Sequence, residues 1–488
     1  MGKVHTLQSP ARAKNIKSSE FLFYMLMVFF YSTMVGMIGE YRRAYLVDGL
    51  QLENNQLALY NGITSAIGYV MAFVYALILD NKKIKNGKKF KNLGLIFAVP
   101  CGLLTILTFY TPGFLENNPS ALLVFLIIIN VIQAGCFYFG GTVNMVAVVM
   151  SPDIREREQL LSFRGVSSAV GNSAPLVIVL VMGVIIKAVK GAEDNMLNYM
   201  LSAVLVGVVG TITMLLGFSA VHERITYSAE KKNPFEGIVD IVKNKHARVV
   251  IFSEFLKSFR GIATFMQPFI AAAMLGSSSK TLIFALPIGV GTMVGMLIIN
   301  ALLKKWGSKT LYIASGVYSV LINLVAFGVG YAKLSHTGGG TGVLEIAFVV
   351  CLFLTGLQFG ASNLLPNMFQ ADILDDIELK TRKRLDAGLP FVIGLGSGLS
   401  GMIASTVVPY ILYGDSSIIH YQQGLADGTE QTLRTKIMLL FFYTVIHGIM
   451  MLLAGLPFLT YKLTGQERAR VHDAVVAQRG GAGNSNSE

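Results

Sequence analysis

Twelve long apolar segments divide this chain of 488 residues, and they constrain its fold more than any other feature of the sequence. Each segment has about the 20 mostly apolar residues that a helix needs to cross a bilayer. The segments are too long to be strands, and they lack the alternation of a membrane barrel. We therefore predict an all-α integral membrane protein with twelve transmembrane helices. These cover about residues 20–47, 57–79, 93–111, 120–150, 164–186, 197–220, 249–275, 281–303, 310–332, 343–370, 389–413 and 437–461.

The low content of charged residues excludes an ordinary soluble protein. Only 14% of the residues are Asp, Glu, Lys or Arg, whereas a soluble domain contains roughly 25%. The cysteines Cys101, Cys136 and Cys351 lie within apolar segments, and their spacing indicates neither a disulfide framework nor a metal site. We expect no cofactor and no metal. The first apolar segment is too long for a cleavable signal peptide and is expected to remain as an anchor.

The distribution of basic residues predicts the orientation of the chain. Thirty of the 40 Lys and Arg residues fall in the two tails and in the loops after the even-numbered segments, whereas six fall in the opposite loops. Cytoplasmic loops carry such an excess of positive charge. We therefore predict a multi-pass protein of the cytoplasmic (plasma) membrane with both termini in the cytoplasm. The net charge of +12 then reflects contact with the lipid bilayer, and no nucleic-acid partner is expected.

The two halves of the chain repeat each other. FGGTVN at 139–144 and FGASN at 359–363 are offset by 220 positions, as are Gly87 and Gly307. Duplicated halves around a site at the membrane midplane are typical of secondary transporters. The predicted parts are a cytoplasmic tail (1–19), a six-helix bundle (20–220), a cytoplasmic linker (221–248), a second six-helix bundle (249–461) and a cytoplasmic tail expected to be disordered (462–488).

Charged loops after the second, fourth and tenth segments contain residues of both signs. Such residues can form ion pairs between the bundles when the cytoplasmic side is closed. The alternative is that the loops are solvated and only set the topology. The candidate residues of this cytoplasmic gate and its signature loops are Asp80, Gly87, Asp153, Arg155, Arg157, Asp375, Glu378 and Arg384.

These loops resemble a known family of transporters. SPDIREREQLLSFR (151–164) and ADILDDIELKTRKR (371–384) are similar to the two signature loops of the glycoside–pentoside–hexuronide:cation symporters, the family of the melibiose carrier. DNKKIKNGKKF (80–90) resembles the loop after the second span of that family. The resemblance implies the major facilitator fold and alternating access of two six-helix bundles around a central cavity. It also implies that Arg164 matches the arginine that reaches the sugar.

The chain departs from the family at the cation site and the sugar pocket. The resemblance places the family's cation-site acidic residues at Gly68, Ala72 and Gly140, none of which has a carboxylate. Because sodium requires hard oxygen ligands, we expect transport that is proton-coupled or uncoupled. The family's lysine falls near Gly398, and its pocket tryptophans fall near Asn144 and Asn363. Stacking on a sugar would then use Phe137, Tyr138 or Phe139.

Ionisable residues within apolar segments indicate function, because their burial in a bilayer is costly. Glu40, Arg42 and Arg43 lie in the first segment, and Glu254, Lys257 and Arg260 lie in the seventh. One interpretation is pairing within each helix three residues apart, with Arg42 and Arg43 extending to the membrane surface. The other is that Arg260, Arg164 and Arg43 bind an anionic substrate while Glu40 carries the coupled proton.

Three further polar or small-residue features have a structural alternative. Asn144 and Asn363 lie at matched positions and can bind substrate hydroxyls or join helices by hydrogen bonds. His447 is expected to be a paired structural residue. Gly291 and Gly295 form a candidate helix contact of the GxxxG type.

Sequence favours a transporter over other classes of membrane protein. We predict a secondary transporter of a glycoside, uronide or related small solute that functions as a monomer. The alternative on the same fold is a carrier of lysolipids or other amphiphiles. A membrane enzyme or a sensor is disfavoured, because the chain has no HExxH, G-x-S-x-G or Walker A motif.

Overall fold

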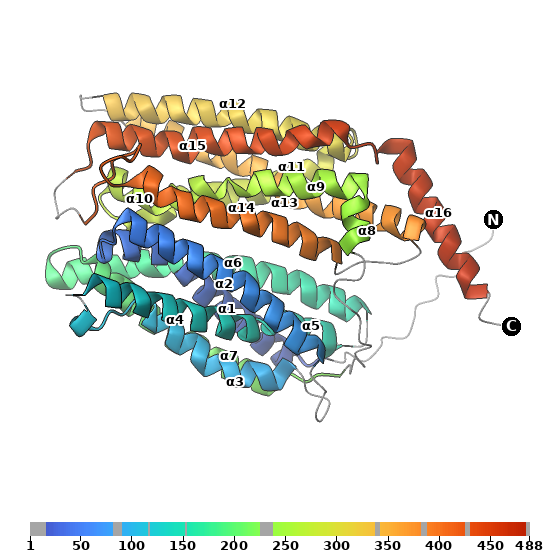
Figure 1. The fold of residues 1–488 in the computed structure, drawn as a ribbon, viewed down its shortest axis with the longest axis horizontal. Helices are drawn as coiled ribbons and strands as arrows, with labels where there is room; N and C mark the ends of the chain where they lie inside the picture. The colour runs from blue at the N-terminus through green and yellow to red at the C-terminus, as the bar shows by residue number, and fades with distance from the viewer. Residues whose placement is uncertain are drawn as a thin grey trace, which may run out of the picture. The chain divides into compact units, whose positions relative to one another are not determined.

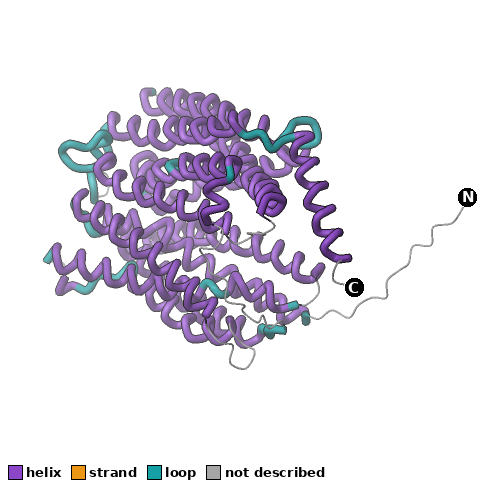
Figure 2. Tube along the Cα trace, turned by 45° about the vertical axis from the view of Figure 1, so that its right-hand side comes forward, coloured by secondary structure: helices purple, strands orange, loops and turns teal. Residues whose placement is uncertain are grey.

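A computed structural model of the chain describes residues 16–81, 90–115, 118–151, 154–224, 238–336, 342–381, 388–424 and 430–484. Every regular element in these ranges is a helix (Figures 1 and 2). Helices suit a chain in lipid because they satisfy their backbone N–H and C=O groups internally. The fold class predicted from the sequence is confirmed.

The elements of the first half run from α1 to α7. They are α1 (Ser18–Ala44), the π-helix η1 (Tyr45–Gly49), α2 (Asn54–Asn81), α3 (Phe90–Leu107), the 3₁₀ turn η2 (Gly113–Leu115), α4 (Pro119–Gly140), α5 (Val143–Met150), α6 (Ile154–Lys190) and α7 (Asn195–Ala220).

The elements of the second half run from α8 to α16. They are α8 (Ile238–Lys243), α9 (Lys245–Ser258), α10 (Gly261–Leu275), η3 (Ser278–Thr281), α11 (Leu282–Leu302), α12 (Ser308–Ser335), α13 (Gly342–Thr381), α14 (Gly388–Leu412), α15 (Leu433–Gly455), η4 (Leu456–Thr460) and α16 (Gly465–Asn484).

Ten helices in the described part of the chain are long and apolar enough to cross a membrane. They coincide with ten of the twelve predicted segments. The other two segments correspond to α2 and to the pair α9 and α10, which have 14 and 15 residues and are separated at Phe259 and Arg260. The total of twelve spans therefore stays a prediction.

The chain forms two compact units. Unit 1 contains residues 1–42, 70–182 and 196–230, and unit 2 contains 43–69, 183–195 and 231–488. Unit 2 therefore includes η1 and the first part of α2, which come from the first half of the sequence. Hydrogen bonds hold this segment to the second half: the Asn61 amide donates to the Ser405 carbonyl at 2.8 Å, and the Gln423 amide donates to the Leu52 carbonyl at 2.9 Å.

Small residues allow the helices within each unit to approach closely. In unit 1, a Cβ added to Gly171 of α6 would overlap the Phe29 carbonyl of α1. In unit 2, α11 and α13 pack through two facing GxxxG pairs, Gly291 with Gly295 and Gly356 with Gly360. The predicted contact at Gly291 and Gly295 is confirmed, and Gly356 and Gly360 complete it.

The C-terminal segment differs from the sequence prediction. Residues 465–484 form the helix α16, where disorder was expected. Val471 and Val475 are buried, and the Arg468 Nε donates to the Asp372 carboxylate of α13 at 2.8 Å. The expectation of disorder was wrong for this segment because contacts to α13, distant in sequence, hold the helix.

Candidate substrate-binding site

Arg260 lies at the interruption between α9 and α10 in unit 2. Its guanidinium carbon lies 4.5 Å from the centre of the Phe359 ring of α13, in a cation–π contact. Its Nη1 atom is buried and makes no hydrogen bond with the described residues. A buried guanidinium nitrogen that lacks an acceptor in the described residues is costly, so Arg260 is a candidate for contact with an anion or another acceptor.

Two further buried polar side chains lie on the helices that adjoin Arg260. The Phe359 ring also packs against His447 of α15, with the ring centres 5.0 Å apart. His447 is buried, and its Nε2 has no hydrogen-bond partner in the described part of the chain. The same holds for both polar atoms of the neighbouring Gln358 side chain. His447 thus lacks the pairing expected at Nε2, and Gln358 and Phe359 were missed by sequence reasoning.

The other charges of the seventh predicted segment are neutralised locally. The Lys257 ammonium donates to the Glu254 carboxylate at 2.6 Å, as the spacing of three residues predicted. It also lies 3.4 Å from the Ser362 carbonyl, toward which it donates. The two basic residues differ in hydrogen bonding, because the Lys257 ammonium donates to Glu254 whereas the Arg260 Nη1 has no hydrogen-bond partner among the described residues. The Glu254 charge nevertheless also acts on Arg260.

In unit 1, the structure brings Arg164 and Asn144 together. The Arg164 Nη1 of α6 donates to the main-chain carbonyl of Asn144 at 2.7 Å. Asn144 belongs to α5, which is separated from α4 at Gly141 and Thr142. This main-chain carbonyl, in the first turn of α5, orients the arginine that the resemblance matches to the sugar-contacting arginine of the family.

Aromatic residues near the end of α4 pack against neighbouring helices of unit 1. The Tyr138 ring stacks on Tyr75 of α2 with centres 6.1 Å apart, and Phe139 stacks on Phe97 of α3 at 4.8 Å. The Tyr31 hydroxyl of α1 donates to the Phe137 carbonyl at 2.8 Å. Phe137, Tyr138 and Phe139 are all partly exposed, and Tyr138 is the one of the three that also has a hydroxyl group.

The remaining predicted site residues are placed separately. Asn363 of α13 is exposed, and its main-chain carbonyl accepts a hydrogen bond from the Asn367 amide at 3.0 Å. Glu40 is partly exposed near the end of α1 in unit 1. Arg43 belongs to unit 2, where its guanidinium lies 4.3 Å from the centre of the Phe265 ring.

Neighbouring side chains fill two of the positions at which the family's ionic residues were expected. A Cβ on Gly140 would lie 2.7 Å from the Cys101 sulfur and 3.4 Å from the Tyr31 ring. A Cβ on Gly398 of α14 would overlap the ring of Tyr69. A longer side chain at either position would require the neighbouring side chains to repack. The helix contacts therefore favour glycine over a carboxylate at Gly140 and over a lysine at Gly398.

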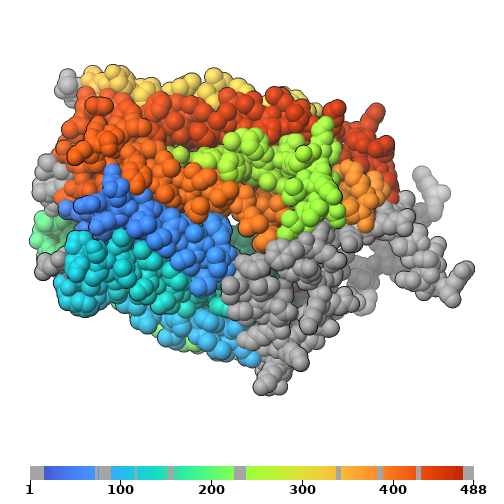
Figure 3. Space-filling model, viewed as in Figure 1, coloured from blue at the N-terminus to red at the C-terminus, as the bar shows by residue number. Residues whose placement is uncertain are grey.

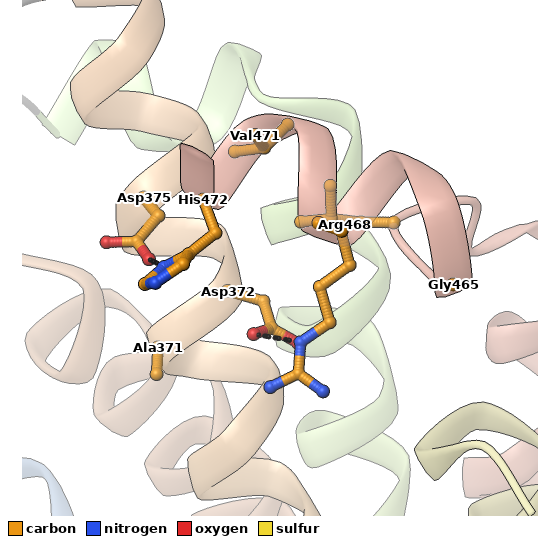
Figure 4. Close-up of a pocket in the computed structure, with 9 residues that line it drawn as sticks. Ala371, Asp372, Asp375, Gly465, Arg468, Val471 and His472 are labelled. Atoms are coloured by element: carbon orange, nitrogen blue, oxygen red, sulfur yellow. Dashed lines mark hydrogen bonds and ion pairs between the residues drawn. The ribbon is translucent and has the colours of Figure 1, made fainter. Parts of the chain in front are cut away.

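The predicted gate residues are only partly described. Gly87, Asp153 and Arg384 lie outside the described residues, and so do the side chains of Asp80, Arg155 and Arg157. Asp375 lies 3.4 Å from the His472 Nδ1 of α16, beside a cavity of about 450 Å³ in unit 2 (Figure 4). Glu378 follows on α13. Ion pairing of this group between the bundles stays a prediction.

Comparison with known proteins identifies the family. The model of the family described as "MFS/sugar transport protein" matches residues 9–465. The chain belongs to this MFS/sugar transport family. YagG of Escherichia coli (strain K12), whose name describes a glycoside/cation symporter, is 23% identical over 420 residues, which cover 83% of this chain and 84% of YagG.

Solved structures of transporters share the fold of this MFS protein. The xylose transporter XylE from E. coli has a TM-score of 0.56 at 12% identity, covering 90% of this chain and 97% of XylE. A bacterial homologue of the human lysosomal transporter Spinster has a TM-score of 0.57 at 15% identity, covering 91% and 98%. The chain is therefore a multi-pass membrane transporter of the major facilitator fold, and the predicted family and transporter function are confirmed.

Proposed function

We propose that this protein moves an anionic glycoside, such as a uronide or a related sugar acid, across the membrane by alternating access. The observation that carries the proposal is the buried Arg260 Nη1, which has no acceptor in the described part of the chain. Guanidinium groups bind carboxylates with two parallel hydrogen bonds, which gives strength and orientation. A substrate carboxylate would supply the partner that the described residues do not.

The groups around Arg260 suit the rest of a sugar acid. His447 offers a ring nitrogen that the described residues do not pair, and Phe359 offers an aromatic ring. Gln358 is a further buried amide without a partner in the described residues, on the same helix as Phe359. Unit 1 has its own proposed substrate-binding residues, Arg164 and Asn144 for hydroxyl contacts and Tyr138 for ring stacking. Arg43 and Asn363 complete the proposed set of substrate-binding residues.

We further propose that transport is coupled to protons or is uncoupled, rather than driven by sodium. Gly68, Ala72 and Gly140 provide no carboxylate at the positions of the family's cation site, and packing around Gly140 leaves no room for one. Glu40 is the candidate proton carrier. Its protonation would remove a negative charge from the first predicted span and so release a basic partner.

We propose that the protein lies in the cytoplasmic membrane with both termini in the cytoplasm and works as a monomer without catalytic activity. The excess of Lys and Arg in the loops after the even-numbered segments supports this orientation. The duplicated halves supply a complete transport unit within one chain.

The test compares two ligands that differ only at the carboxylate, methyl β-D-glucuronide and methyl β-D-glucoside, by thermal unfolding of the purified full-length protein. A ligand at ~100 times its dissociation constant stabilises by about 2.7 kcal/mol. We expect stabilisation by the glucuronide, its loss in Arg260→Gln, and its retention in the control Arg470→Gln, an exposed residue of α16.

The unliganded variant distinguishes a binding role from a structural one. Arg260→Gln removes a buried charge that lacks a complete set of partners, so the unliganded variant should be at least as stable as the wild type. Equal stabilisation by the glucoside, or a glucuronide effect that survives Arg260→Gln, would contradict the proposal.

A further inference from the structure

A groove with apolar walls lies on unit 2 between α9 and the end of α15 with η4. Its volume is about 580 Å³. Phe252 and Leu256 of α9 form one wall, and Leu453 and Leu456 form the other. Phe252 is 54% exposed and Leu456 is 46% exposed. In Figure 3, α9 (yellow-green) and α15 (red) both reach the visible surface of this unit, together with α12 and α14. None of the residues proposed to bind substrate lines this groove.

One end of the groove is positively charged. Lys245 and Arg248 line it near the start of α9, and both are exposed. Neither forms an ion pair with a carboxylate of the described residues, in contrast to Lys257 farther along the same helix. The charge at this end is therefore available to an external anion.

The dimensions of the groove match one leaflet of a bilayer. Lys245, Arg248, Phe252 and Leu256 recur at intervals of three or four residues and so share one face of α9. The rise of the helix from Lys245 to Leu256 is about 16 Å. Half of the hydrocarbon core of a bilayer is about 15 Å thick. A molecule whose head contacts the basic end can therefore lay a chain along the apolar wall for the depth of one leaflet.

We propose that this groove is a binding site for an anionic glycerophospholipid. Lys245 and Arg248 contact the phosphate headgroup, and an acyl chain packs against Phe252, Leu256 and Leu453. Basic pockets of this kind at the membrane surface bind anionic headgroups. The bound lipid covers apolar side chains of both α9 and α15 and thereby holds the two helices together.

The test measures which lipid remains on the full-length protein. The protein is reconstituted in nanodiscs of phosphatidylcholine that contain a minor fraction of phosphatidylglycerol. It is then released from the nanodiscs inside a mass spectrometer, and the lipids that remain bound to it are identified and counted. Two basic contacts at a membrane surface predict a preference for phosphatidylglycerol on the order of tenfold. We expect the double variant Lys245→Gln/Arg248→Gln to lose most of this preference.

The matched control removes the same charge elsewhere. Lys304→Gln/Lys305→Gln changes two exposed lysines that do not line the groove and should leave the preference unchanged. An equal loss in both double variants would show general surface attraction and overturn the proposal.

The apolar wall needs a separate experiment with two readouts, lipid retention by mass spectrometry and thermal unfolding. Phe252→Ser should weaken the retention of phosphatidylglycerol, and soluble sn-glycerol 3-phosphate should not stabilise the wild type. Stabilisation by glycerol phosphate as large as that by the lipid would overturn the proposal, because the acyl chain would then contribute nothing.

Discussion

Two arginines of this transporter have opposite surroundings. The Arg224 guanidinium donates to both oxygens of the buried Glu20 carboxylate, at 2.9 and 2.7 Å, and to the Met150 carbonyl at 2.8 Å. The Arg260 Nη1 has no such partner in the described residues. The same residue type therefore neutralises a buried carboxylate in unit 1, whereas in unit 2 it has a buried nitrogen without a hydrogen-bond partner among the described residues.

Arg224→Ala should destabilise the protein, because it leaves the buried Glu20 carboxylate with fewer partners. Removal of one member of a fully buried pair costs about 3–5 kcal/mol, and the partial exposure of Arg224 reduces our expectation to about 2 kcal/mol. Thermal unfolding in detergent measures the effect, with Arg470→Ala on the exposed face of α16 as the control. Equal midpoints for the two variants would show that the pair contributes nothing.

The helix pair α11 and α13 shows how small residues set the packing at the scale of elements. Gly291 and Gly295 face Gly356 and Gly360, and the backbones approach so closely that an added Cβ overlaps a main-chain atom of the other helix. Lipid tails are as apolar as the side chains of a transmembrane helix, so the hydrophobic effect does not drive two such helices together. Close van der Waals contact between the helices does.

Gly295→Ala should lower stability by about 1–3 kcal/mol, the usual cost of overpacking. The added Cβ would overlap the Leu357 carbonyl, which is backbone and cannot rotate away. Gly289→Ala, on the same helix, is the matched control, since nothing lies within 4 Å of its Cβ position. The midpoints of thermal unfolding of the two variants measure the difference in stability. A Gly295→Ala protein as stable as Gly289→Ala would contradict the close packing of α11 and α13.

At the scale of the whole molecule, the carboxylates available within the spans decide which ion we expect to be coupled to transport. Gly68, Ala72 and Gly140, where the resemblance places the family's cation site, have no carboxylate, whereas Glu40 lies within the first predicted span. In proteoliposomes, an inwardly directed proton gradient should therefore drive uptake of methyl β-D-glucuronide if transport is coupled, and a sodium gradient alone should not.

Glu40→Gln should abolish the response to the proton gradient and leave exchange of the glucuronide intact, because the amide cannot carry the proton. Glu53→Gln, an exposed residue just after the first span, is the control. Sodium-driven uptake, or unchanged proton-driven uptake in Glu40→Gln, would exclude this form of coupling.

Particular residues show how far sequence reasoning extends to the site. The spacing of Glu254 and Lys257 predicted their ion pair, since residues three apart on a helix face each other. Gln358 and His447 gave no comparable signal, because they lie on different helices and are 89 positions apart. The interruption at Phe259 and Arg260 was also missed, since a single predicted segment covered 249–275.

The sequence by itself determined the helical membrane fold, the internal repeat and the transporter family. Hydropathy is a local property that sums along a segment, and family motifs are contiguous, so both can be identified in one dimension. Only the tertiary structure decided that the Arg260 Nη1 has no hydrogen-bond partner among the described residues, that Tyr69 fills the space at Gly398, and that α16 packs against α13. Each depends on which side chains meet across helices far apart in the sequence, and the free energy of a buried polar group is set by those neighbours.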